Sequence, residues 1–141
     1  RTHILNASAT YQLLDNEGPK IFGAAIFENI DLSLILKAST GAPYTPSGRD
    51  VGFVELNSLR QPGVYTIDLI FGKSFNIVKT LELRIFAEIY NLTDHRNVLY
   101  VYPDTGDPDF TFEGGYSTEY MQHPSNYGPP RVIRLRASIR F

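Results

Sequence analysis

Hydrophobic and polar residues alternate with a period of two along much of this chain. Between residues 5 and 13 the odd positions are apolar and the even positions are polar. Successive side chains of a β-strand point to opposite faces of its sheet, so this alternation predicts a strand with one apolar and one polar face. Further segments repeat the pattern less strictly, at residues 32–39, 65–72, 81–90 and 133–141.

The lengths of these segments and of their connections predict an all-β fold, an antiparallel up-and-down meander. The alternation gives about five strands, most of them near the roughly 9–11 residues that a tilted membrane strand needs. Soluble strands are commonly shorter, at about 5–6 residues. A short connection at residues 76–80 contrasts with long loops at 41–63 and 91–130, and this asymmetry is typical of outer-membrane β-barrels.

The two faces leave two architectures open, because a β-sandwich also buries one face and wets the other. Charges within the strands favour a membrane barrel, whose inner face is polar and whose outer face meets lipid. The charges expected to face the lumen are Glu82, Arg84, Glu88, Arg134, Arg136 and Arg140. The residues expected to face lipid are Leu5, Ala7, Ala9, Leu32, Leu34, Leu36, Ile67, Leu69, Leu83, Ile85, Ala87, Leu135, Ala137 and Ile139. Since the smallest outer-membrane barrels have about eight strands, residues 1–141 are expected to be the C-terminal part of a larger transmembrane barrel. The rest of that barrel is then absent or supplied by another chain.

The last two predicted strands are joined by the 91–130 loop, so they are expected to pair as antiparallel neighbours. Placing Leu81 opposite Phe141 matches their apolar faces, and residue numbers across the ladder then add up to about 222. The same register sets Glu82 opposite Arg140 and Glu88 opposite Arg134. Opposite charges facing each other contribute roughly 0.2–1 kcal/mol per pair, which favours this register when both pairs form. The alternative is a slip of two residues, which keeps the apolar faces and retains one pair, Glu88 with Arg136.

Composition and charge remove several classes of function. The chain has 13 basic and 15 acidic residues, for a net charge of −2, so it lacks the basic excess of a nucleic-acid binder. It has no cysteine, which excludes disulfides, thiolate metal sites and cysteine nucleophiles. No uncharged apolar run reaches the roughly 18 residues of a transmembrane helix. No catalytic constellation stands out, so neither enzymatic activity nor a cofactor is expected.

The 91–130 loop contains the residues most suited to ligand contact. Asp104, Asp107 and Asp109 form an oxygen-rich stretch that is a weak calcium candidate, with an acidic turn as the simpler interpretation. His95 and His123 are expected to be solvated loop residues rather than metal ligands. The loop is also unusually aromatic, and its rings either pack on one another or contact a ligand such as a glycan or peptide. The ring-bearing candidates are Tyr100, Tyr102, Phe110, Phe112, Tyr116 and Tyr120, with Tyr127 beside them.

Several motifs in order resemble the C-terminal end of TonB-dependent outer-membrane receptors. They are RTHILNASATYQL at residues 1–13, STGAPYTP at 39–46, LRQPGVYTIDLIFGKSF at 59–75, IFAEIYNLTDHRNVLYVYPDTGDPD at 85–109 and PPRVIRLRASIRF at 129–141. Within that family the chain is most similar to large receptors with a carboxypeptidase-regulatory-like N-terminal domain. The aromatic end at Phe141 resembles the signal read by the barrel-assembly machinery.

The resemblance implies a large plugged barrel in the outer membrane of a Gram-negative bacterium, used for active uptake of a scarce ligand. It implies as partners the lipid, the rest of the barrel and its plug, TonB through an N-terminal part not present here, the assembly machinery and a surface lipoprotein. It also places Phe141 on the periplasmic side, so loops 41–63 and 91–130 are expected to be extracellular and 76–80 periplasmic. The alternatives are a soluble β-sandwich that binds a ligand such as carbohydrate, and a passive outer-membrane pore.

Overall fold

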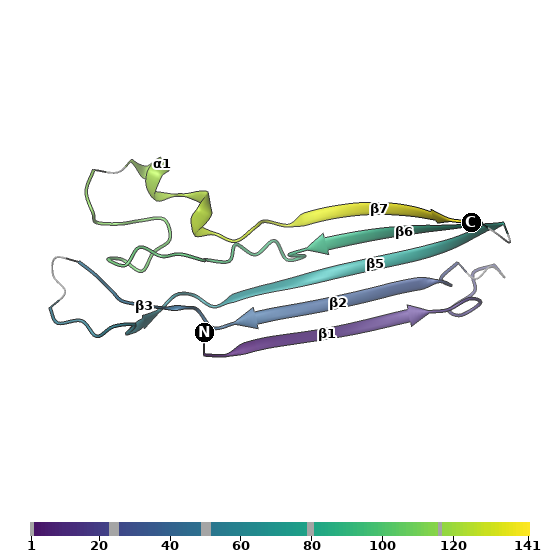
Figure 1. Cartoon of the computed structure of the whole chain (residues 1–141), viewed down its shortest axis with the longest axis horizontal. Coiled ribbons are helices and arrows are strands. Elements are labelled where there is room, and N and C mark those ends of the chain that lie inside the picture. The colour runs from purple at the N-terminus through teal and green to yellow at the C-terminus, as the bar shows by residue number, and fades with distance from the viewer. Residues whose placement is uncertain (1, 23–25, 49–51, 79–80, 116) are drawn as a thin grey trace. The chain divides into compact units, whose positions relative to one another are not determined.

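A five-stranded sheet, mostly antiparallel, dominates the computed structural model, which describes residues 2–22, 26–48, 52–78, 81–115 and 117–141 (Figure 1). Its strands are β1 (Ile4–Leu13), β2 (Ile30–Ser39), β5 (Val64–Val78), β6 (Leu81–Tyr90) and β7 (Val132–Arg140), in the spatial order β1-β2-β5-β6-β7. The chain is 47% strand and 5% helix. The predicted all-β class is therefore confirmed.

The long connections carry short elements of their own. In the 41–63 loop, β3 (Pro43–Tyr44) pairs antiparallel with β4 (Leu59–Arg60), and residues 49–51 lie outside the described part of the chain. The 91–130 loop contains the helix α1 (Thr118–Met121) and the 3₁₀ helix η1 (Pro124–Asn126). No helix in the described ranges is both long and apolar enough to cross a membrane.

The strand β5 is longer than the sequence pattern predicted. It continues to Val78, with an irregularity in its pairing between Asn76 and Val78. Most of the predicted 76–80 turn therefore belongs to a strand, while residues 79–80 are outside the described ranges. The prediction ended too early because Lys73, a charged residue, occupies an apolar position of the alternation.

The predicted register between the last two long strands is confirmed. In the β6–β7 ladder Leu83 lies opposite Ile139 and Ala87 lies opposite Leu135. A one-residue slip would have turned every side chain of β7 to the wrong face, so the match of apolar faces determines the parity of the pairing.

The chain divides into two compact units, which are described separately below. The first, called the sheet unit, comprises Asn6–Leu36, Thr66–Thr93 and Arg131–Phe141. The second, called the loop unit, comprises Arg1–Leu5, Lys37–Tyr65 and Asp94–Pro130. Among the described residues the only buried hydrophobic side chain is Val101, in the loop unit.

The apolar face of the sheet unit is exposed. Ile85 is 40% exposed, Ile139 is 59% exposed and Leu135 is 76% exposed. These are the residue types that normally fill the interior of a soluble domain. The sheet unit therefore presents an extended hydrophobic surface, opposite a face that carries its charges.

Candidate functional site

The register gathers the charges of β6 and β7 on one surface of the sheet unit, called here the charged face. Residues directly opposite each other in a ladder point to the same side. In the β6–β7 ladder Glu82 lies opposite Arg140, Phe86 opposite Arg136 and Glu88 opposite Arg134. Arg84 lies two residues from Glu82 on β6, so it points to the same side. All of the charges predicted from the alternation therefore share one face.

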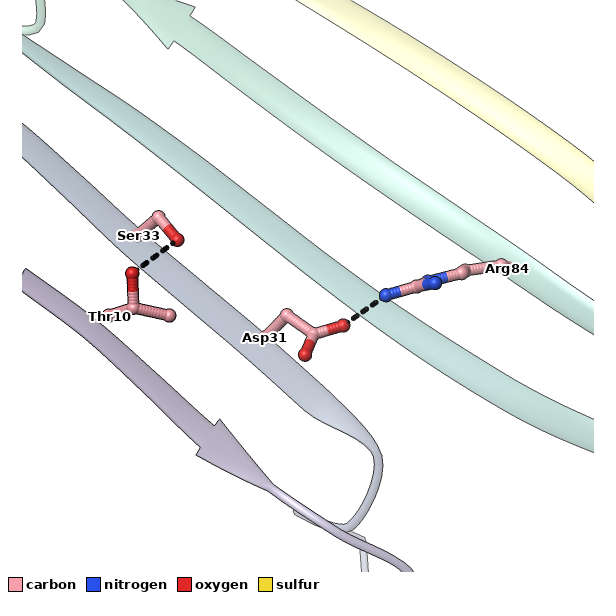
Figure 2. Close-up of polar contacts among 4 residues, drawn as sticks. All are labelled: Thr10, Asp31, Ser33 and Arg84. Atoms are coloured by element: carbon pink, nitrogen blue, oxygen red, sulfur yellow. Dashed lines mark hydrogen bonds and ion pairs between the residues drawn. The ribbon is translucent and has the colours of Figure 1, made fainter.

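An ion pair crosses this face over the middle strand. Asp31 of β2 accepts a hydrogen bond from the Arg84 guanidinium of β6, although β5 lies between the two strands, as Figure 2 shows. Gly72 of β5 makes the crossing possible because it has no side chain. A Cβ atom there would lie 3.2 Å from the ring of Phe86 and 3.6 Å from the Cβ of Asp31. The Arg84 guanidinium carbon also lies 4.7 Å from the centre of the Phe86 ring.

The same face extends to the first strand through neutral groups. The hydroxyls of Thr10 on β1 and Ser33 on β2 are 3.1 Å apart and form a hydrogen bond (Figure 2). Between these strands and β6 lies a polar hollow of about 270 Å³. Its lining combines amides, hydroxyls and charges from Gln12, Asn29, Asp31, Ser74, Asn76, Glu82 and Arg84.

The second ion pair differs from the one predicted. Glu88 is buried and pairs with Arg136, one step along the face, instead of Arg134 directly opposite. The Arg134 guanidinium instead lies over the ring of Tyr90, 5.2 Å from its centre, and the Tyr90 hydroxyl donates to Glu88 at 3.2 Å. Diagonal partners lie within reach of a long side chain, so the backbone register alone does not determine which arginine binds the carboxylate.

Two polar residues that sequence reasoning did not single out organise the end of β6. Asp68 is buried and its carboxylate accepts a hydrogen bond from the backbone N–H of Asn91 at 3.0 Å. Asn91 adopts a φ of 54°, in the left-handed region that asparagine tolerates better than most residues. The next residue, Leu92, donates its N–H to the Ile67 carbonyl at 2.7 Å. The signal in the sequence was an Asp in mid-strand and an Asn at a strand end.

In the loop unit, Asn97 takes the place of a paired strand residue. Its side-chain oxygen accepts from the Tyr65 N–H and its amide nitrogen donates to the Tyr65 carbonyl, both at 2.7 Å. The Asn97 carbonyl also accepts from the Gly128 N–H at 2.8 Å, and the Tyr65 ring stacks on His95 at 4.2 Å. These contacts hold distant parts of the 91–130 loop together around one buried amide, and periodicity gave no indication of them.

The carboxylates of the acidic stretch accept hydrogen bonds from donors within the loop. Asp104 accepts from the Thr111 hydroxyl at 2.7 Å, Asp107 from the Asp109 N–H at 2.7 Å, and Asp109 from the Tyr127 hydroxyl at 2.6 Å. Within the described ranges no group of His, Cys, Asp or Glu side chains is arranged to hold a metal ion. These hydrogen bonds are typical of an acidic turn, and the calcium site stays a prediction.

Two groups of this turn have shifted pKa values. Desolvation raises the pKa of Asp104, but hydrogen bonds from Thr111 and from backbone N–H groups outweigh it and hold the pKa below its usual value. Partial burial raises the pKa of Tyr127, and its hydrogen bond to the Asp109 carboxylate raises it further. The Arg96 guanidinium stacks over the Tyr127 ring at 4.0 Å. The turn is thus held by charged hydrogen bonds that depend on pH.

The loop aromatics form local pairs and leave other rings exposed. Tyr100 and Tyr102 meet edge to face at 5.7 Å, and Phe110 and Phe112 do so at 5.1 Å. The Tyr102 hydroxyl also donates to the Met121 carbonyl of α1 at 3.0 Å. Phe112 is 75% exposed, and Tyr100, Phe110 and Tyr120 are also exposed. Tyr116 lies outside the described ranges. Packing thus accounts for part of the aromatic content of the loop.

The remaining sequence candidates have simple roles. The His123 side chain accepts from the Ser125 N–H and begins η1, and Phe141 is 96% exposed beyond the end of β7. Comparison with protein-family models, curated proteins and solved structures found no match. Two features of the molecule bear on its function: the contrasting faces of the sheet unit and the contacts around Asn97 in the loop unit.

Proposed function

We propose that this chain is part of the wall of an outer-membrane β-barrel, the C-terminal segment of a TonB-dependent receptor that takes up a scarce ligand. The observation that carries the proposal is the contrast between the two faces of the sheet unit. One face exposes aliphatic side chains such as Leu135 and Ile139, and the other carries the Asp31–Arg84 and Glu88–Arg136 ion pairs.

A hydrophobic face of this kind requires a covering. Exposed apolar patches larger than a few hundred Å² mark interaction surfaces in soluble proteins. A sandwich would cover the face with a second sheet about 10 Å away. In the membrane the covering is the lipid, and alternating apolar and polar positions suit a wall between lipid and an aqueous lumen. The charges within the strands favour lipid over a second sheet as the covering of the apolar face.

The edges of the sheet support the same proposal. β1 and β7 are the outermost strands in the sheet order. A strand edge in lipid leaves backbone N–H and C=O groups without partners, at several kcal/mol for each group. A membrane location therefore requires further strands beside β1 and β7. The added strands and the five strands of this sheet would close a barrel with no free edge.

Active uptake is inferred from the sequence motifs and agrees with the organisation of the loop unit. The ordered 91–130 loop, built around Asn97, is suited to an extracellular surface that meets a ligand. On this proposal the energy arrives from TonB through a plug encoded outside residues 1–141, and a surface lipoprotein and the assembly machinery act as further partners.

Two measurements test the proposal. The protein should remain with the membrane fraction in alkaline carbonate and be released by detergent; release by buffer alone would support the soluble binding module instead. In planar bilayers with potassium chloride, a plugged receptor should conduct little current until denaturant displaces the plug. A steady open conductance without denaturant would support the passive pore and contradict active uptake.

A further inference from the structure

Lys73 is a charged residue on the apolar face of β5. Lys73 lies opposite Ile85 in the β5–β6 ladder, and its nearest same-face neighbours along the strand are Phe71 and Phe75. A lysine in this position cannot leave its ammonium group in hydrocarbon without a large cost. Its long apolar stem allows the charged end to reach a polar region while the stem lies along apolar surface.

The contacts of the ammonium group show where that polar region is. Lys73 Nζ donates to the carbonyl oxygens of Ile26 at 2.7 Å and Glu28 at 2.8 Å, and lies 5.2 Å from the centre of the Phe75 ring. Ile26 and Glu28 belong to the connection between β1 and β2. Because Lys73 leaves β5 on the apolar side, these bonds hold the connection at the border of the apolar face.

The same connection exposes several large apolar side chains to solvent. The exposed fractions are 42% for Ile21, 106% for Phe22, 51% for Ile26 and 39% for Phe27. Phe22 has a φ of 50°, in the left-handed region that costs a residue with a Cβ atom roughly 1–2 kcal/mol. A strained backbone that presents an aromatic ring outward is a reason to look for a function.

We propose that the described residues of the connection between β1 and β2, at 14–22 and 26–29, form an interfacial membrane anchor. Its apolar side chains insert at the headgroup–acyl boundary of the leaflet beside the short connections of the sheet, and Lys73 holds it there. This inference rests on the proposed function, since it takes the apolar face of the sheet to lie in lipid. Lipid is the occupant that the structure favours, because the Lys73 bonds hold the exposed residues at the border of the apolar face. A long lysine stem with a charged end is also favoured at membrane interfaces.

The chain contains no tryptophan, so single tryptophans can report depth. We would place them one at a time by Phe22→Trp, Ile85→Trp and Phe86→Trp, and reconstitute each protein in phosphatidylcholine vesicles. Some vesicles carry bromine near the glycerol end of the acyl chains and others near the methyl end. Tryptophan at position 22 should be quenched roughly twofold more by the shallow bromines, at an interfacial depth of about 5–10 Å. At position 85, which lies opposite the backbone of Lys73, the deep bromines should quench more strongly than they do at position 22. At position 86, on the charged face, neither bromine position should quench strongly.

The outcomes separate the inference from the proposed function. Deep quenching at position 85 without quenching at position 22 overturns the anchor and leaves the membrane wall standing. No lipid quenching at position 85 overturns both. Quenching at position 22 that is lost as protein concentration rises would assign the surface to a second copy of the chain and overturn the lipid anchor.

A second variant tests the role of Lys73 itself. In the Phe22→Trp protein, Lys73→Met removes the donor to the carbonyls and should reduce the shallow quenching by roughly half. Lys20→Met, which removes a charge from the same connection, is the matched control and should leave the quenching unchanged. The Ile85→Trp reporter in the Lys73→Met background verifies insertion. Equal shallow quenching with and without Lys73 would overturn its role as the tether.

Discussion

Gly72 should be the most sensitive position for a side chain on the charged face, and replacing it tests how the ion pair crosses β5. The nearest atoms to an added Cβ are Cδ1 and Cε1 of Phe86, both at 3.2 Å, and the Asp31 Cβ at 3.6 Å. The second distance is ordinary van der Waals contact, whereas the first requires the ring to shift. The expected damage therefore comes from Phe86 more than from Asp31.

Two opposing effects determine how much a replacement of Gly72 changes the free energy of unfolding. Glycine within a strand is less stable than alanine by roughly 0.5–1 kcal/mol, because it loses more backbone freedom on folding. In Gly72→Ala this gain and the small ring shift should nearly cancel. In Gly72→Val the added methyl groups overpack the space used by the Phe86 ring and the Asp31–Arg84 pair, and overpacking costs about 1–3 kcal/mol.

A double-mutant cycle measures the coupling between a side chain at position 72 and the ring of Phe86. The free energy of unfolding would be obtained from urea titrations followed by circular dichroism, for Gly72→Val, Phe86→Ala and the double variant. Removing the ring should make room for the valine, so its cost should fall by at least about 1 kcal/mol in the Phe86→Ala background. An equal cost of Gly72→Val in both backgrounds would refute the assignment of the strain to Phe86.

Three further predictions concern the loops. Asn97→Ala removes the hydrogen-bond partner of the part-buried N–H and C=O of Tyr65, at about 0.5–1.5 kcal/mol for each bond. It should raise hydrogen exchange in the 91–130 loop; unchanged exchange would contradict the role of the amide. The lowered pKa of Asp104 stabilises the folded loop above the ordinary carboxyl pKa, and this contribution is lost as pH falls below about 4 through the folded-state pKa. Asp104→Asn should remove that acid sensitivity of the near-ultraviolet circular dichroism, and an identical pH profile would count against it. Protease added to intact cells should cut within 41–63 or 91–130, whereas cutting between β5 and β6 would invert the topology.

The sequence predicted those parts of the fold that a period of two determines. Alternation located the long strands and fixed which side of each is apolar. In the β6–β7 pair it predicted the parity, because only one parity brings Leu83 and Ile139 to the same face. Setting Leu81 opposite Phe141 then selected the observed register among those of that parity. The end of β5 was missed for a related reason: Lys73 breaks the alternation, and a lysine can occupy an apolar face when its ammonium group reaches carbonyls beyond it.

The site was less predictable, because its contacts join residues far apart in the sequence. The Asp31–Arg84 pair depends on a glycine in the intervening strand, and periodicity assigns no role to an absent side chain. The choice of Arg136 over Arg134 by Glu88 depends on side-chain reach and on the competing ring of Tyr90. These preferences amount to about 1 kcal/mol each, which is too little for a pattern of residue types to reveal.

The central claim is that one face of the sheet unit meets lipid and the other meets water. The chain has no cysteine, so spin labels can be attached at consecutive introduced cysteines along β6, from Leu83 to Glu88, in the protein reconstituted in lipid vesicles. Accessibility to oxygen should be highest at the odd positions, and accessibility to a water-soluble nickel complex should be highest at the even positions, with a period of two. Nickel accessibility as high at Leu83, Ile85 and Ala87 as at the even positions, or the lack of any alternation, would contradict the proposal that this sheet is the wall of a membrane barrel.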